Sequence, residues 1–145
     1  MNLDHICIAV RSIDRARERM VSLLGYKPRT NKVTNTRQQV VVQFLRKTGS
    51  IDIKLIEPSS SASPLVEFLK KGGGFHHICF KADDGQQAIT ELTDGGARLI
   101  AKPQPGEAFD DHMIAFMYLG FGLNVEIIDT DSRRAEIDQN GLAAN

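Results

Sequence analysis

Two histidines, one glutamate and one lysine stand where a duplicated sequence pattern could assemble a single chemical site. His5 lies in Leu-Asp-His-Ile-Cys-Ile, and His77 lies in Phe-His-His-Ile-Cys-Phe, 72 residues further on. The same offset pairs Lys54 with Glu126. Neutral imidazoles and a carboxylate are ligands for divalent transition metals, whereas a lysine ammonium has no lone pair to donate. The four residues therefore predict either a three-ligand metal site or a site in which Lys54 supplies the positive charge.

The offset extends over both halves of the chain without a gap, which indicates a tandem repeat. Apolar residues in the middle and at the end of the first half fall on apolar residues of the second half. Further pairs with this offset are Ala16 and Ala88, Phe44 and Phe116, and Ile53 and Val125.

Each half has the pattern of one strand, one helix and three further strands. Apolar spacing and turn residues predict these elements. In the first half they are a strand over 3–10, a helix over 12–24 that begins at Ser12 and ends at Gly25, and strands over 26–33, 38–46 and 51–57. In the second half they are strands over 75–82, 97–101, 112–119 and 123–129, with a helix over 85–94.

We therefore predict an α+β fold of tandem βαβββ repeats. The repeats would form a curved, mixed, eight-stranded sheet around a cup, with the helices on the convex side. A single domain would span 1–130, with repeat one at 1–57, a linker and short helix at 58–74, and repeat two at 75–130. Residues 131–145 form a polar C-terminal tail, which we expect to fray.

Strand alternation places the four candidate residues on one face. Successive side chains of a strand point to opposite faces, so the apolar neighbours of His5, Lys54, His77 and Glu126 would pack on the helices. The four polar residues would then face the cup, where a small-molecule site is expected. His76 has the opposite parity, so we expect it on the helix side or behind the site. A buried carboxylate is costly without a partner, so Glu126 requires a metal or a lysine.

Composition excludes several classes of protein. The 145 residues include 18 basic and 18 acidic side chains, which disfavours a nucleic-acid partner. No apolar run reaches the ~20 residues that span a bilayer, and the first residues do not resemble a leader. The two cysteines show no disulfide pattern. We expect a cytoplasmic protein without a membrane partner.

The segments around these residues resemble the vicinal oxygen chelate superfamily, which includes glyoxalases, bleomycin-resistance proteins and extradiol dioxygenases. Leu3-Asp4-His5-Ile6 and Phe75-His76-His77-Ile78 resemble its two histidine-bearing strands, and Asn124-Val125-Glu126-Ile127 resembles its glutamate-bearing last strand. Within the superfamily the chain is most similar to methylmalonyl-CoA epimerases. That similarity includes the stretch from Ser63-Pro64-Leu65 to Gly74-Phe75-His76-His77-Ile78, together with Arg98-Leu99-Ile100 and Pro105-Gly106.

The resemblance implies a divalent metal, such as Co, Ni, Zn, Mn or Fe, held by His5, His77 and Glu126. The fourth position of the family site is usually Glu or Gln, and here it is Lys54. Three interpretations stay open. The three remaining ligands hold the metal; Lys54 replaces the metal and the site is metal-free; or the cup binds a ligand without turnover, as resistance-type members do.

The function implied by the resemblance is an isomerase, epimerase or glyoxalase-type lyase that abstracts a proton next to a carbonyl or thioester. Glu126 and Lys54 are the catalytic candidates, and the substrate would be a small molecule such as a CoA thioester. An Fe(II) oxygenase is a further alternative. Family members often dimerise, so we expect a homodimer.

Overall fold

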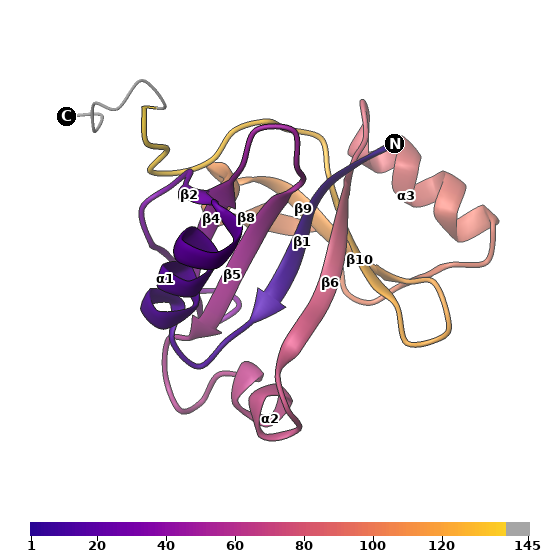
Figure 1. The fold of residues 1–145 in the computed structure, drawn as a ribbon. Coiled ribbons are helices and arrows are strands. Elements are labelled where there is room, and N and C mark those ends of the chain that lie inside the picture. Colours follow the sequence, from indigo (N-terminus) through magenta and orange to yellow (C-terminus); the bar gives the residue numbers. More distant parts are fainter. Residues whose placement is uncertain (139–145) are drawn as a thin grey trace.

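Two antiparallel strands, β1 (Asn2–Ala9) and β6 (Gly74–Lys81), lie at the centre of a mixed sheet (Figure 1). In the computed structural model, which describes residues 1–138, each central strand has a parallel neighbour from its own half of the chain. β1 pairs with β5 (Asp52–Pro58), and β6 pairs with β10 (Asn124–Ile128). The two repeats therefore meet at the β1–β6 pair.

The remaining strands extend the sheet on both sides, giving the order β2-β4-β5-β1-β6-β10-β9-β7. β3 and β8 pair with β4 and β9 off this path, so the sheet has ten strands within residues 1–138. The extra strands arise because the predicted strands 26–33 and 97–101 are shorter than expected and each is followed by a second short strand. The bounds are β2 (Lys27–Pro28), β3 (Val33–Asn35), β4 (Val40–Arg46), β7 (Arg98–Leu99), β8 (Gln104–Gly106) and β9 (His112–Tyr118).

The two long helices begin and end where the sequence predicts. In α1 (Ile13–Leu24), the Ser12 side chain accepts a hydrogen bond from a first-turn amide, and Gly25 ends the helix at φ 73°. In α3 (Gly85–Asp94), Asp84 caps the first turn in the same way. Each helix packs on the strands of its own half, and Figure 1 shows them at opposite ends of the sheet.

Strand alternation sorts the apolar side chains into clusters on the two faces of the sheet. Ile6, Ile8, Ile53 and Leu55 pack in the cluster that includes α1 residues, and Ile78, Phe80, Val125 and Ile127 pack in the cluster that includes α3 residues. The other side chains of the same strands form a third cluster. It includes Cys7, Phe44, Ile56, Cys79 and Ile128.

Two short helices complete this third cluster. The helix α2 (Leu65–Lys70) contributes Leu65 and Leu69, so it packs on the face opposite to α1 and α3. The 3-10 helix η1 (Glu107–Phe109), which the sequence did not predict, contributes Ala108 and Phe109. The face of the sheet opposite to α1 and α3, which is the predicted cup, is therefore covered by α2 and η1. Both helices lie in linkers between strands.

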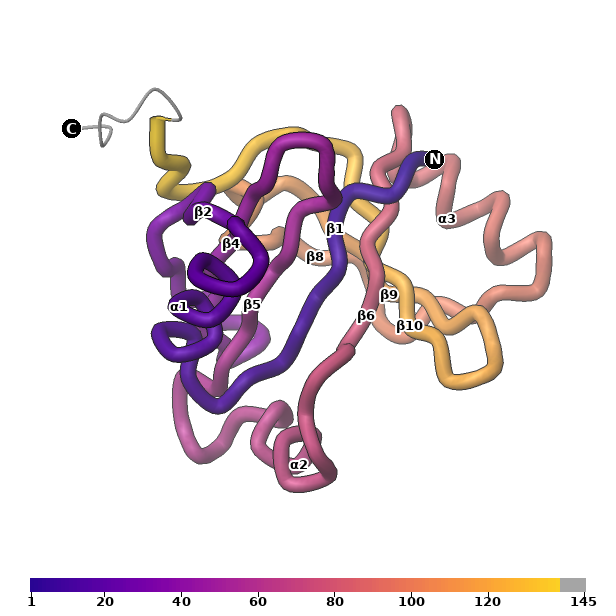
Figure 2. Tube along the Cα trace, viewed as in Figure 1, coloured from indigo at the N-terminus to yellow at the C-terminus, as the bar shows by residue number. Residues whose placement is uncertain are grey.

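The expectation that the C-terminal tail frays is wrong for residues 131–138. Glu136 forms an antiparallel bridge with Thr30, and the amide of Ile137 donates to the carbonyl of Arg29. Arg133 is 4% exposed. In Figure 2 this yellow segment runs from the second half back to the first half, beside β2. The remaining tail residues lie outside the described part of the chain.

Among the helices of residues 1–138, none has the length and apolar character required to cross a bilayer.

Candidate active site

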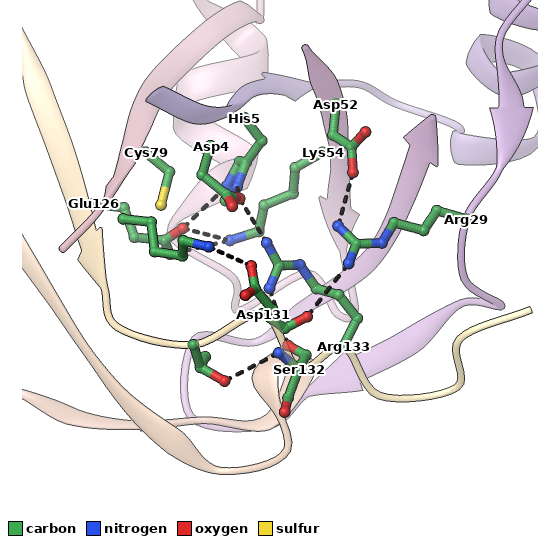
Figure 3. A network of polar contacts seen from close by, with 12 residues as sticks. Asp4, His5, Arg29, Asp52, Lys54, Cys79, Glu126, Asp131, Ser132 and Arg133 are labelled. Carbon is green, nitrogen blue, oxygen red and sulfur yellow. Dashed lines mark hydrogen bonds and ion pairs between the residues drawn. The ribbon is translucent and has the colours of Figure 1, made fainter. Parts of the chain in front are cut away.

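The structure brings the four predicted residues together at the centre of the sheet. The carboxylate of Glu126, on β10, lies 3.1 Å from Nε2 of His5 and 3.6 Å from Nε2 of His77. Nζ of Lys54, on β5, lies 3.1 and 3.3 Å from the two oxygens of the same carboxylate. All four residues are at most 3% exposed. The four residues related by the offset of 72 therefore form one buried polar group, in which the other three all lie close to Glu126. Figure 3 labels His5, Lys54 and Glu126.

Each histidine directs its Nε2 atom toward Glu126, and this atom forms no hydrogen bond within residues 1–138. Nε2 of His5 and Nε2 of His77 are buried and have no hydrogen-bond partner among the described residues, although each lies close to the carboxylate. Buried polar atoms are nearly always satisfied, so two orphaned nitrogens beside one carboxylate require an explanation. The three ligand atoms lie within 4.8 Å of one another, which is compatible with a shared metal ion.

The other ring nitrogen of each histidine contacts the residue that precedes it. Nδ1 of His5 lies 2.7 Å from Oδ2 of Asp4, and Nδ1 of His77 lies 2.8 Å from Nδ1 of His76. Asp4 and His76 occupy equivalent positions in the two repeats, 72 residues apart. Such contacts fix the ring orientation of a histidine and determine which nitrogen faces the site.

These contacts are possible because both central strands contain an irregularity. In the β1–β6 pairing, Leu3 and His5 face the consecutive residues Phe80 and Cys79, so Asp4 is an extra residue. In the same way, Cys7 and Ile8 face His77 and Phe75, so His76 is extra. A bulge of this kind redirects a side chain and breaks simple alternation.

For His76, the expected place on the helix side is therefore wrong, whereas the alternative, a place behind the site, agrees with the contact between its Nδ1 and Nδ1 of His77. Its ring packs edge-on against Phe68 of α2, with the centroids 4.8 Å apart, and it lines the same cavity as His77. The error has a physical cause, since strand parity holds only where the ladder is regular.

A cavity of about 310 Å³ opens beside the four residues. Lys54 and His77 form part of its wall, whereas Glu126 is fully buried and does not. The wall is mostly apolar, which suits the acyl part of a small molecule. Its other lining residues are Gln38, Val40, Ile56, Pro64, Leu65, His76, Ile100, Ala101, Phe116 and Asn124.

The opposite charges of Lys54 and Glu126 each stabilise the ionised form of the other side chain. Burial alone would lower the pKa of Lys54, but the negative charge of Glu126 raises it above the usual value. Burial alone would raise the pKa of Glu126, but the charge of Lys54 and the two histidines hold it well below its usual value. Burial lowers the pKa of His77 to about 4. At neutral pH the structure therefore contains a buried ammonium–carboxylate pair beside a neutral His77.

Aromatic rings enclose the group on the side of η1. The ring of Phe109 stacks on His5 with the centroids 6.1 Å apart, and Nζ of Lys54 lies 5.1 Å from the Phe109 centroid. Phe44 packs edge-on against His5. These rings exclude water from the back of the site and leave the cavity as its open side.

Two further triplets of potential ligands overlap this one. Cys7 lies near His76 and His77, and Cys79 lies near Asp4 and His5. Burial raises the pKa of the Cys7 thiol to about 12, and it raises that of Cys79 well above its usual value. A thiol ligates a metal as the thiolate, and burial opposes that ionisation when no metal is bound.

The donor set fits a divalent metal at His5, His77 and Glu126, on one condition. A divalent ion and an ammonium ~4 Å apart repel by about 8 kcal/mol at an effective dielectric constant of ~20. That is a large part of the ~10–16 kcal/mol that structural zinc sites gain on binding. Lys54 would therefore have to leave Glu126 and turn toward the cavity, whose wall it already forms.

Sequence reasoning missed the residues that lie behind His5. Nη2 of Arg133 lies 2.6 Å from Oδ2 of Asp4, and its guanidinium lies over the rings of Phe44 and Phe109. The sequence signal for Arg133 was weak, because it follows the last strand in a polar segment. Asp4 carried a clearer signal, since it occupies the repeat position of His76.

Comparison with known proteins agrees with this fold. An uncharacterized protein, YqjC, of Bacillus subtilis is 38% identical over 116 residues, covering 79% of this chain and 81% of that protein. An ethylmalonyl-CoA/methylmalonyl-CoA epimerase of Cereibacter sphaeroides is 30% identical over 105 residues, covering 71% and 77%. The crystal structure of a methylmalonyl-CoA epimerase from Mycobacterium tuberculosis superposes with a TM-score of 0.79 at 27% identity, covering 88% and 87%.

The family profile described as "Glyoxalase/Bleomycin resistance protein/Dioxygenase superfamily" matches residues 4–116, a range that includes His5, Lys54 and His77. Together with the paired βαβββ repeats, this match shows that the chain belongs to the glyoxalase/bleomycin resistance protein/dioxygenase superfamily.

Proposed function

We propose that the protein is an isomerase of the epimerase type, which removes and returns a proton on the carbon next to a thioester carbonyl. The observation that carries this proposal is the pair of orphaned histidine nitrogens facing Glu126 beside an apolar cavity. The named epimerases among the similar proteins support the substrate class, a CoA thioester with a second carbonyl or carboxylate nearby.

In this proposal His5, His77 and Glu126 hold a divalent metal. When bound, such a metal stabilises negative charge on the two substrate oxygens and so acidifies the C–H bond between them. Loss of that proton leaves an enolate, and its return to the opposite face gives the epimer with no net change in composition.

The roles of the chain's own residues follow from their positions. Lys54 lines the cavity, and its ammonium can donate a proton to the substrate or bind one of its oxygens, but it cannot accept the proton that leaves. The carboxylate of Glu126 is therefore the group that would accept that proton. Glu126 lies behind Lys54, so it reaches a substrate only when the ion pair between them opens. The apolar wall excludes water from the acyl group, while a CoA moiety would extend from the open side.

A second candidate is a metal-free form of the same reaction. The specific observation in its favour is that the ammonium of Lys54 already contacts both oxygens of Glu126. A buried cation at this position could polarise a substrate carbonyl in place of the metal. Both candidates keep Lys54 on the cavity wall, but they differ in their requirement for metal.

The test is exchange of the α-proton of methylmalonyl-CoA with solvent deuterium, measured by mass spectrometry. Protein purified without chelator should catalyse exchange, whereas Glu126→Gln and Lys54→Met should lose it. Lys27→Met, an exposed lysine of β2, is the control and should retain it. Absence of exchange in the wild-type protein, with or without added Co(II), would contradict the proposed function.

Elemental analysis of the same preparations separates the two candidates. Stoichiometric transition metal that is lost in His5→Ala supports the metal-dependent reaction. Exchange that continues in chelator-treated protein, and that Co(II) does not increase, would instead support the lysine-assisted reaction.

A further inference from the structure

The segment after β10 returns to the first half of the chain and contacts the back of the site. The amide of Asn31 donates to the carbonyl of Ala135, and Thr30 forms a bridge with Glu136. This segment lies beyond residues 4–116, which the family profile matches. The family match therefore says nothing about the contacts of this segment.

The side chain of Arg133 enters the protein from this segment and is fully buried. Its guanidinium lies 4.8 Å from the centroid of Phe44 and 4.6 Å from that of Phe109. Nη1 donates to the carbonyl of Ser132, and Nη2 donates to Oδ2 of Asp4 at 2.6 Å. A buried charge is tolerated when it is paired and hydrogen-bonded, so Asp4 is the counter-ion that allows Arg133 to be buried.

Asp4 connects Arg133 to the site. The same oxygen, Oδ2, contacts Nη2 of Arg133 and Nδ1 of His5 (Figure 3). A carboxylate only accepts hydrogen bonds, so the contact with Asp4 places a hydrogen on Nδ1 of His5 and turns Nε2 toward the site. Nε2 is the atom that faces Glu126 without a hydrogen bond.

The second histidine is held differently. His77 contacts the ring of His76, not a carboxylate, and no guanidinium pairs with that contact within residues 1–138. The two repeats thus present similar histidines to Glu126 but orient them by different groups. The Arg133–Asp4 pair makes His5 the histidine with the better-defined orientation.

We propose that Arg133 is a positioning residue. It holds the Asp4 carboxylate, and Asp4 orients the ring of His5 so that Nε2 points to the space between His5, His77 and Glu126. The inference deepens the proposed function and rests on it in one respect, because it takes a metal or a substrate to bind in this space. The geometry of the chain from Arg133 through Asp4 to His5 does not depend on that use.

The first test uses metal-free protein and the nitrogen NMR spectrum of the His5 ring. In the wild-type protein we expect the form with hydrogen on Nδ1. Arg133→Met keeps an unbranched apolar side chain between the two phenylalanine rings and removes the guanidinium, so the His5 signals should move toward a mixture of the two tautomers. Arg133→Lys keeps a positive charge and should restore part of the wild-type signal.

The second test measures the affinity of the metal-free protein for Co(II) by titration calorimetry. Loss of a group that orients a ligand typically weakens metal binding by roughly 10- to 100-fold, which is the effect expected for Arg133→Met. Arg134→Met is the matched control, because Arg134 pairs with the exposed Asp110 and Asp111 at the surface. That control should bind Co(II) as the wild type does.

A double-mutant cycle with Asp4→Asn shows whether Arg133 acts through Asp4. If it does, adding Arg133→Met to Asp4→Asn should cause little further loss of affinity. If the losses of Co(II) affinity caused by Arg133→Met and Asp4→Asn simply add, the inference is overturned. It is also overturned if folded Arg133→Met protein has a lower melting temperature but keeps the wild-type His5 signals.

Failure of the proposed function gives a different pattern. A wild-type protein that binds no Co(II) and exchanges no α-proton would remove the proposed function, while the shift of the His5 tautomer in Arg133→Met would still support the positioning role. An unchanged His5 tautomer would remove the positioning role and leave deuterium exchange unaffected.

Discussion

Lys54 and Glu126 are buried side chains of opposite charge at equivalent positions of the two repeats. Either charge alone would be costly in the interior, and their contact at 3.1 Å offsets much of that cost. In the metal site proposed above, Lys54 would hold the place of a fourth ligand. One residue therefore determines whether the site favours an internal ion pair or an external cation.

We expect Lys54→Gln to bind Co(II) more tightly than the wild-type protein. Glutamine removes the repelling ammonium and supplies a carbonyl oxygen that can ligate. The dissociation constant should fall at least about tenfold, because relief of only ~1.4 kcal/mol of repulsion gives that factor. Titration calorimetry of metal-free protein measures the change.

Lys54→Met is the control that separates charge from ligation. It removes the ammonium without providing a donor, so its affinity should lie between those of the wild type and Lys54→Gln. Weaker binding by both variants would mean that Lys54 itself supports the metal, which contradicts the argument from repulsion.

At the scale of elements, the bulges of β1 and β6 and the helix η1 shape the site. The bulges place Asp4 and His76 beside the histidines that follow them. The helix η1 brings Phe109 against the ring of His5. Neither feature belongs to a regular strand or helix, so the shape of the cup depends on local departures from regularity.

Gly106, which directly precedes η1, has little space for a side chain. A Cβ atom there would lie 2.9 Å from Cγ2 of Ile114 and 3.0 Å from Cδ2 of Phe109. Because overpacking typically costs about 1–3 kcal/mol, Gly106→Ala should lower the free energy of unfolding by that amount. Urea denaturation followed by circular dichroism measures this.

Gly95→Ala provides the comparison for that substitution. Gly95 has φ −78°, and a Cβ atom there would lie no nearer than an ordinary 3.4 Å to its neighbours, so the protein should keep nearly its full stability. Equal stability of Gly106→Ala and the wild type would show that η1 shifts freely and does not fix Phe109.

At the scale of the whole molecule, Arg29 joins three segments that are distant in sequence. It follows β2, its Nη1 donates to Asp52 of β5 at 2.8 Å, and its Nε donates to Glu136 at 3.0 Å. Nη2 also donates to the carbonyl of Asp131. The return of the C-terminal segment, which brings Arg133 to the site, is therefore secured by a second buried arginine.

Arg29→Met should destabilise the whole protein by about 3 kcal/mol, because it leaves Asp52 buried with weaker compensation. Arg46→Met is the control, since Arg46 is more exposed and lies 3.5 Å from the same carboxylate, and its loss should cost under ~1 kcal/mol. Unfolding in urea measures both. Similar losses would show that Arg29 does not anchor the segment.

The sequence by itself determined the duplicated architecture and the four polar residues at its centre. Helix caps, apolar periodicity and strand alternation are local properties, so they can be recognised without knowledge of the pairing. A single offset then identified His5 with His77 and Lys54 with Glu126, and the structure places all four within contact distance.

The tertiary structure alone decided how these residues are oriented and which of them reach the cavity. The face of His76 depends on a bulge, which exists only in the pairing of β6 with β1. The contact of Arg133 with Asp4 joins residues 129 positions apart, a separation that no local pattern can report. Lys54 lines the cavity and Glu126 does not, because burial is set by the packing of the complete molecule.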